Sequence, residues 1–140
     1  MARKRGLEAL AQVPLFSHLT PRQLGRVLEV SEEYVFDEGA TLAKEDTPGE
    51  TFFVILEGEA RVVRHGRTVA RLLPGDFFGE ISLLDGGHRT ASVVAVTPIR
   101  ALLLLGDDFR KLLIEEPKLA VKILRELSGM LRRIEHAVSG

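Results

Sequence analysis

The stretch GDFFGEISLLDGGHRTASVVAV, residues 75–96, decides the fold, because it joins a glycine, a short apolar run, a glycine turn and a strand. Gly79 precedes a run, Glu80–Leu84, that is compatible with a short helix. A glycine at the start of a helix lets the backbone approach a ligand closely, and the free N–H groups there favour an anion. Arg89 then leads into an alternating strand, where an arginine needs either solvent or an anionic partner. The pattern predicts that Glu80 and Arg89 lie at different edges of one pocket.

The two charged residues indicate what kind of molecule that pocket accepts. Glu80 falls in the first helical turn, where the helix dipole tolerates a carboxylate that accepts hydrogen bonds from hydroxyls. Arg89 offers rigid, paired donors that suit a phosphate. The pattern favours recognition of one small molecule with hydroxyls beside a phosphate. No second carboxylate is paired with Glu80, and no serine lies beside a histidine in a recognised motif, so we expect no enzyme.

Length and composition are those of one globular domain. The chain has 140 residues, enough for a single domain with a sizeable core. Hydrophobic residues make up 45% and charged residues 28%, which is ordinary for a soluble protein. A net charge of −1 gives no overall field that attracts nucleic acid or an anionic membrane. We expect the basic start, MARKR, to be a solvated tail.

Several classes of site are excluded by what the sequence lacks. Without cysteine there is no disulfide, thiolate zinc site, iron–sulfur cluster or cysteine nucleophile. The four histidines are far apart and lack the spacing of metal ligands, which argues against a cupin-like metal enzyme. No apolar run approaches the roughly 18 residues of a membrane span, and no signal peptide is visible. We therefore expect a cytoplasmic protein with no metal, no cofactor and no membrane partner.

The pattern of apolar residues and glycines divides the chain into three parts. Helices are predicted over about 5–31, where Thr20, Pro21 and Gln23 form a helix start signal. From about 33 to 105, short apolar runs punctuated by glycine predict a small antiparallel sandwich or barrel. The continuous run FFVIL predicts a strand buried on both faces.

The last third, about 107–138, is predicted to be helical again, with Asp107 as an N-cap. Pro117 opens a long helix whose apolar residues recur every three and four positions, as in a coiled-coil seam. Leu124, Leu131 and Val138 form a second stripe beside the seam and widen the apolar face. We expect one stripe to face the strands and the other a partner chain in a homodimer; a single thick core face is the alternative. The predicted seam is Ala120, Ile123, Leu127, Met130, Ile134 and Ala137.

The motif FGEISLLDGGHRTASV resembles the phosphate-binding cassette of cyclic nucleotide-binding domains. That superfamily includes the bacterial catabolite activator protein, the regulatory subunits of cAMP-dependent protein kinase and cyclic nucleotide-gated channels. The segment FDEGATLAKEDTPGETFFVILEGEARVV is similar to the pattern that precedes the cassette in the family. The resemblance covers nearly the whole chain. It implies one domain over 1–140, an antiparallel, jelly-roll-like β-roll (a double-stranded β-helix) with N-terminal helices, a short phosphate-binding helix and a long C-terminal helix.

The resemblance also implies roles for individual residues. Glu80 would bind the ribose 2′-hydroxyl, Arg89 the cyclic phosphate, and Thr90 the phosphate or the base, without choosing between cAMP and cGMP. In the family, the C-terminal helix closes the base side of the pocket. Arg132 and Arg133 would stack on a purine there, or simply form a solvated face. The ligand-binding residues expected from the cassette are Phe78, Gly79, Glu80, Ile81, Ser82, Arg89, Thr90 and Ala91.

The function that follows from the resemblance is a regulatory module that binds cAMP or cGMP and transmits its occupancy through the C-terminal helix. Two alternatives stay open. In the first alternative, the chain is a degenerate scaffold that mediates protein–protein contacts without ligand. In the second, it is the sensor part of a transcription regulator whose DNA-binding domain is absent. In the transcription-factor branch a helix-turn-helix follows the long helix, but this sequence stops at Gly140, so we expect no direct DNA binding. The downstream protein partner stays unknown.

Overall fold

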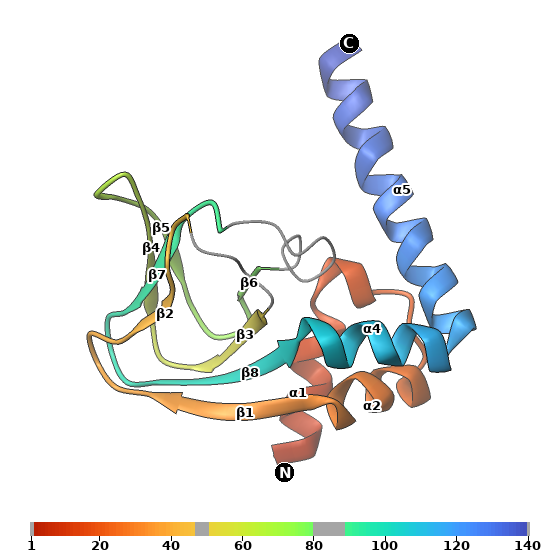
Figure 1. Cartoon of the computed structure of the whole chain (residues 1–140), viewed down its shortest axis with the longest axis horizontal. Coiled ribbons are helices and arrows are strands. Elements are labelled where there is room, and N and C mark those ends of the chain that lie inside the picture. Colours follow the sequence, from red (N-terminus) through yellow and green to blue (C-terminus); the bar gives the residue numbers. More distant parts are fainter. Residues whose placement is uncertain (1, 47–50, 80–88, 140) are drawn as a thin grey trace.

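The computed structural model describes residues 2–46, 51–79 and 89–139. Two four-stranded antiparallel sheets form a roll, and the helices gather at one end of it (Figure 1). This confirms the predicted mainly β fold with flanking helices. The helices are α1 (Ala2–Ala11), the 3-10 turn η1 (Pro14–Phe16), α2 (Pro21–Glu29), α4 (Gly106–Glu115) and α5 (Pro117–Ser139). The strands are β1 (Ser31–Phe36), β2 (Thr41–Ala43), β3 (Thr51–Glu57), β4 (Ala60–Arg64), β5 (Arg67–Leu72), β6 (Phe77–Phe78), β7 (Ser92–Ala95) and β8 (Ile99–Leu105).

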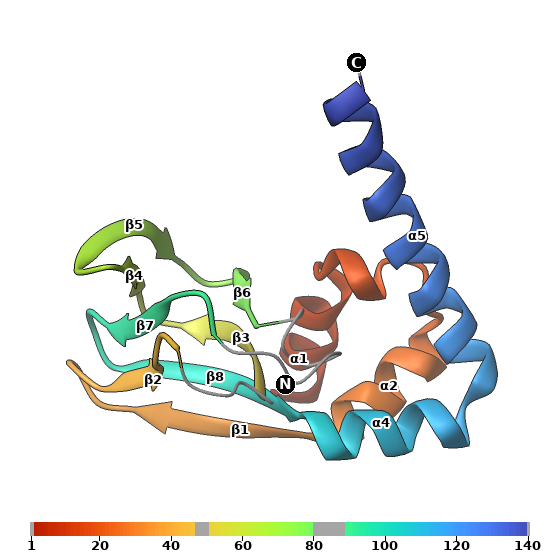
Figure 2. The same ribbon diagram turned by 45° about the horizontal axis from the view of Figure 1, so that its top comes forward.

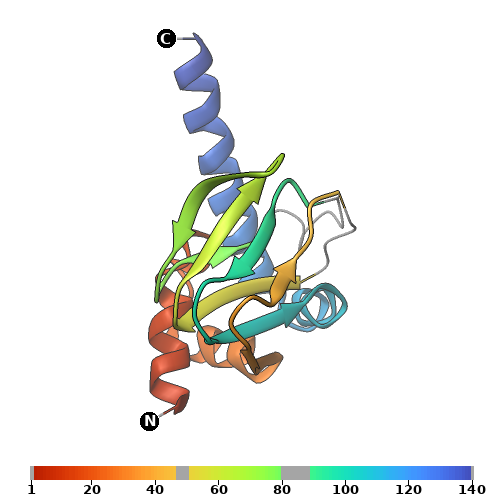
Figure 3. The same cartoon turned by 90° about the vertical axis from the view of Figure 1, so that its left-hand side faces the viewer.

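The strand order is β1-β8-β3-β6 in one sheet and β2-β7-β4-β5 in the other. Figure 3 shows the second sheet on its face, with β5 at the edge and β4 next to it. Glycine turns separate β3, β4 and β5 as the sequence predicts, and Thr97-Pro98 separates β7 from β8. Arg89, three residues before β7, reaches the first residue of β3, because its side chain donates a hydrogen bond to the carbonyl of Thr51.

Strand β3 is buried on both faces because a separate core packs on each. Phe52, Val54 and Leu56 face the helices, whereas Phe53 and Ile55 face the interior of the roll. This confirms the expectation for the run FFVIL. The interior contains many small side chains, because alanines from four strands and from the segment before β7 point inward. They are Ala43, Ala60, Ala91, Ala95 and Ala101.

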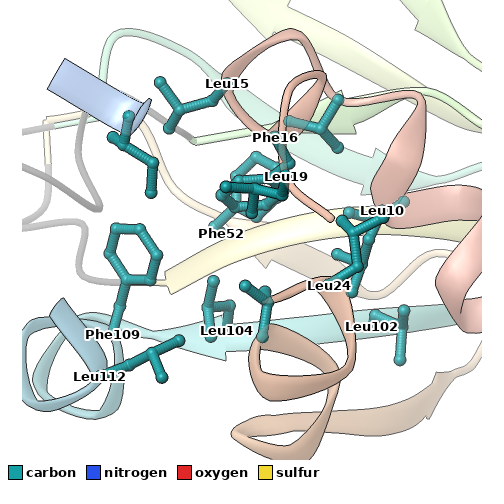
Figure 4. Packing of buried hydrophobic residues seen from close by; sticks show 14 of the residues in the cluster. Leu10, Leu15, Phe16, Leu19, Leu24, Phe52, Leu102, Leu104, Phe109 and Leu112 are labelled. Carbon is teal, nitrogen blue, oxygen red and sulfur yellow. The ribbon is translucent and has the colours of Figure 1, made fainter. Parts of the chain in front are cut away.

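The helical core joins both ends of the chain (Figure 4). The ring centroid of Phe16 lies 6.0 Å from that of Phe52 and 6.1 Å from that of Phe109, so η1, β3 and α4 meet at one point. Leu119 and Ile123 of α5 are also buried in this core. Since each fully buried aliphatic or aromatic side chain contributes about 1.5–3 kcal/mol, this cluster fixes the first turns of α5 on the domain.

Helix α2 begins as the sequence predicts. The Thr20 hydroxyl accepts a hydrogen bond from the backbone N–H of Gln23 at 3.1 Å, and the Gln23 side chain accepts one from the N–H of Thr20 at 2.9 Å. This is a complete capping box, and Pro21 occupies the first helical turn.

Two local predictions are wrong. The basic start is not a solvated tail, because α1 begins at Ala2 and Arg5 forms an ion pair with Glu57 of β3. The first strand begins at Ser31, close to the predicted bound of about 33, and pairs with β8 along its whole length. Asp107 is not the N-cap of α4. The chain leaves β8 directly into the helix, so Leu105 takes that position, and Asp107 forms an ion pair with Arg110.

Helix α5 packs on the helical end of the roll through its first half, and its C-terminal half projects away from the sheets (Figure 2). Residues 131–136 are all exposed. In the described part of the chain, no helix is long and apolar enough to cross a membrane.

Candidate functional site

Arg89 is the centre of the candidate site. Its side chain is buried, with the residue only 5% exposed, just before β7. Nη2 donates a hydrogen bond to the backbone carbonyl of Thr51 at the start of β3, whereas Nη1 has no hydrogen-bond partner among the residues that the structure describes. Burial lowers the pKa of Arg89, yet a guanidinium stays protonated in proteins. The site therefore holds a buried cation with an unused donor, and such a group needs a partner.

Two aromatic rings hold the guanidinium in place. Its central carbon lies 5.4 Å from the ring centroid of Phe53 and 5.6 Å from that of Phe78. These distances are typical of cation–π contacts. Phe53 and Phe78 are themselves neighbours in the register of β3 and β6. Because the two rings restrict the guanidinium, they also restrict the direction in which Nη1 points.

Gly79 lies directly against the same guanidinium. Its φ of 95° is a conformation that L side chains rarely adopt, and a Cβ there would overlap Nη1 of Arg89. The same Cβ would also lie 2.8 Å from the carbonyl oxygen of Thr51. The sequence predicts that the backbone at Gly79 approaches a ligand closely. The structure places Gly79 against Arg89, and its approach to a ligand stays a prediction.

The other residues expected from the cassette have different environments. Ala91 is buried in the roll interior, and Thr90 is exposed beside Arg89. Glu80, Ile81 and Ser82 lie outside the described residues, as does the predicted short helix. The placement of Glu80 at a second edge of the pocket therefore stays a prediction.

The sequence analysis missed a polar link behind Arg89. The N–H of Asp46, which has a φ of 64°, donates to the carbonyl of Arg89 at 3.0 Å, and the N–H of Glu45 donates to the Ser92 hydroxyl at 2.8 Å. The Glu45 carboxylate accepts a hydrogen bond from the N–H of His65 at 3.0 Å, and Nδ1 of His65 lies 3.1 Å from its other oxygen. Glu45 and Asp46 therefore link the backbone at Arg89 to the β4–β5 turn. No motif marks it in the sequence.

The arginines proposed to close the base side are not brought to Arg89. Arg132 and Arg133 are exposed on the projecting part of α5 (Figure 2), where with Glu135 and His136 they line an open cavity of about 620 Å³. No described contact joins this cavity to Arg89. Their role at the base stays a prediction.

Packing corrects the predicted seam on α5. Ile123 is 2% exposed because it lies in the helical core of its own domain, and Leu127 and Met130 pack partly on that core. Ile123 is therefore not available to a partner. The exposed apolar side chains are Leu124 at 60%, Leu131 at 62% and Ile134 at 60%. Ala120 is half-buried, and the side chain of Ala137 lies outside the described part of the chain.

No group of three or more His, Asp or Glu side chains that could hold a metal ion is found within the described ranges. The buried arginine is thus the chemical feature of the roll interior that the structure defines best.

Comparisons with known proteins agree on one family. Residues 33–116 match the profile of the cyclic nucleotide-binding domain. The chain is 37% identical over 114 residues to the cAMP-dependent protein kinase regulatory subunit of Aspergillus fumigatus, covering 79% of this chain and 28% of that protein. It is 30% identical over 131 residues to the CRP-like cAMP-activated global transcriptional regulator of Mycobacterium tuberculosis, covering 90% and 58%.

Among solved structures, the N-terminal domain of a transcriptional regulator from Streptomyces coelicolor A3(2) is similar along nearly its whole length. The TM-score is 0.87 at 32% identity, covering 93% of this chain and 94% of that one. The chain spans less than two thirds of the length of both curated relatives.

Proposed function

From the premise that the chain belongs to the cyclic nucleotide-binding domain family, we propose that it binds a cyclic mononucleotide and that Arg89 binds the phosphate. The observation that carries this proposal is the buried guanidinium, whose Nη1 has no hydrogen-bond partner among the described residues. A cyclic phosphodiester carries one negative charge, which one guanidinium balances. A charge-assisted hydrogen bond from Nη1 to the phosphate would satisfy a donor that the described residues leave without an acceptor.

The surroundings of Arg89 support binding in preference to catalysis. Thr51, Gly79 and the two phenylalanines restrict the side chain, so it is held ready for an anion. Thr90, next to Arg89, is exposed, so we expect its hydroxyl to be accessible to the same ligand. The names of both curated relatives mention cAMP, which supports cAMP over cGMP as the ligand. We expect the nucleotide to be released unchanged.

We further propose that α5 transmits occupancy of the site. This helix has polar contacts with the N-terminal helical segment: Lys122 donates to the side chain of Gln23 at 2.8 Å, and Glu126 lies 2.8 Å from His18. A ligand that favours one arrangement of α5 over another would shift the population between them, with a typical coupling of about 1–3 kcal/mol.

A homodimer through α5 is the proposed assembly. Leu124, Leu127, Leu131 and Ile134 follow the alternating steps of three and four residues that characterise a coiled coil. Three of these four side chains are highly exposed in the single chain. Because an exposed stripe of this kind is stabilised by burial, a second α5 is a suitable cover for it.

Two alternatives to this proposal differ in whether the chain binds a ligand. A scaffold that has lost its ligand would keep a buried, unpaired charge at Arg89, which is costly, and this disfavours it. A sensor within a longer transcription regulator is compatible with the relatives' greater length and would bind the same ligand. Thermal unfolding with cAMP and with cGMP separates the scaffold from both sensors. A ligand at about 100 times its Kd adds about 2.7 kcal/mol of stability, so we expect a higher midpoint with at least one nucleotide; no rise with either would support the scaffold.

A further inference from the structure

The β4–β5 hairpin carries an unusual arrangement of charge. The register places Arg61 directly opposite Arg71 and Arg64 directly opposite Arg67. Like charges directly opposite each other destabilise an antiparallel pair. The hairpin contains two such pairs in a chain whose net charge is −1, so this cost is local and needs a reason.

Partners within the chain relieve only part of the repulsion. Arg71 forms an ion pair with Glu59 at 2.7 Å, and Arg61 donates to the Thr68 hydroxyl at 3.2 Å. No ion pair is found for Arg64 or Arg67 within the part of the chain that the structure describes. Figure 1 shows the turn between β4 and β5 projecting away from the helices. The hairpin therefore presents positive charge that its surroundings do not match.

The same hairpin provides an open sheet edge. β5 ends the order β2-β7-β4-β5, so one side of its backbone is not paired within the sheet (Figure 3). All residues from 67 to 71 are exposed. Val69 is 58% exposed, and Leu73, just beyond the strand, is 50% exposed. An edge with free backbone groups and accessible apolar side chains is a template for a further strand.

We propose that β5 is a docking edge for an extended acidic segment of a partner protein. The segment adds as a strand to β5 and places carboxylates beside Arg64, Arg67 and Arg71. The arginines also explain why the edge does not pair with its own copy, because two β5 strands would bring arginines together. A nucleic acid fits less well, since it cannot continue the backbone hydrogen bonding, and the carboxylate of Glu59 lies within the patch.

The test uses the full chain and two fluorescent peptides of equal charge. One peptide alternates glutamate with valine, and the other alternates glutamate with proline, which cannot donate backbone hydrogen bonds. Fluorescence anisotropy should show saturable binding of the first peptide only, and this binding should weaken with added salt. In the Arg64→Gln/Arg67→Gln variant we expect affinity to fall about tenfold. The matched control, Lys111→Gln/Lys118→Gln, makes the same charge change on exposed helical residues and should bind like the wild type.

Three results would overturn the proposal: equal binding of the proline peptide, unchanged affinity in the arginine variant, or tighter binding of a DNA duplex than of the valine peptide. Circular dichroism checks that each variant is folded. At position 67 alone, Arg67→Lys keeps the charge and should therefore bind more tightly than Arg67→Gln, with most of the wild-type affinity. The assay contains no nucleotide, so its outcome does not depend on the proposed function.

Discussion

Gly79 and Arg89 are in such close contact that a Cβ on the glycine would lie nearer to Nη1 of the arginine than the 3.0 Å that real Cβ atoms keep. The lack of a side chain at Gly79 therefore leaves room for the guanidinium of Arg89. The guanidinium occupies this space, where Nη2 donates to the carbonyl of Thr51 and Nη1 has no acceptor in the part of the chain that the structure describes. Changes at either residue should alter ligand binding.

Substitution of Gly79 by alanine should weaken nucleotide binding at least tenfold (about 1.4 kcal/mol), because the new methyl group displaces the guanidinium. A matched control is Gly39→Ala, which has a similar φ of 84° but open space where its new methyl group would lie. Both changes should lower the free energy of unfolding by about 1–3 kcal/mol through backbone strain. Calorimetric titration should separate them, and equal affinities in the two variants would contradict the role of Gly79.

The polar link at Glu45 should support Arg89 from behind. We expect Glu45→Ala to reduce affinity several-fold, because the β4–β5 turn loses the acceptor that links it, through the backbone of Glu45 and Asp46, to the carbonyl of Arg89. Glu38→Ala, an exposed acidic position near the β1–β2 turn, is the control and should leave affinity unchanged. Glu45→Gln, which keeps an acceptor oxygen, should restore part of the loss. Equal affinity of all three variants would show that the link does not position Arg89.

The two stripes of α5 should behave differently when mutated. Leu124→Glu/Leu131→Glu removes exposed apolar surface, so we expect a folded monomer where the wild type is a dimer at tens of micromolar. Ile123→Ala instead creates a cavity in the domain core and should lower the free energy of unfolding by about 2–5 kcal/mol. Light scattering and urea unfolding measure the two effects. A monomeric wild type would show that α5 does not form the proposed dimer.

Stability should depend on pH through the contact between α2 and the α4–α5 junction. The hydrogen bond from Arg22, with the nearby charge of Arg26, lowers the pKa of Glu116 below its ordinary value of 4.5. A carboxyl with a depressed pKa in the folded state stabilises the fold above its unfolded pKa, and this contribution is lost as the pH falls through the folded pKa. We expect Glu116→Gln to reduce the loss of stability on acidification below about pH 4.5. Unfolding midpoints for wild type and variant across this range would test the expectation, and parallel curves would contradict it.

Much of the fold could be predicted because the local signals and the packing agree. Glycines end strands where the chain turns, and the run FFVIL is apolar throughout because β3 has a core on each face. The capping box at Thr20 involves neighbours in sequence, so its geometry is encoded locally. Gly79 and Arg89 could be singled out by residue type, whereas their role in binding an anion stays a proposal.

Other features depend on contacts between distant segments and left no local signal. Steps of three and four residues describe two adjacent seams on α5, and only the packing of Ile123 shows which one faces the domain. The basic start becomes helical where Arg5 meets Glu57, far away in sequence. Glu45 is an ordinary loop residue until the roll brings it beside Ser92 and His65.

The most direct test of the central claim is calorimetric titration of wild type, Arg89→Ala and the exposed control Arg125→Ala with cAMP and with cGMP. We predict that the wild type and Arg125→Ala bind at least one nucleotide equally, and that Arg89→Ala loses about 2–5 kcal/mol of binding free energy, since a buried phosphate loses its charged partner. Equal affinity of wild type and Arg89→Ala would contradict the claim that this arginine binds the phosphate.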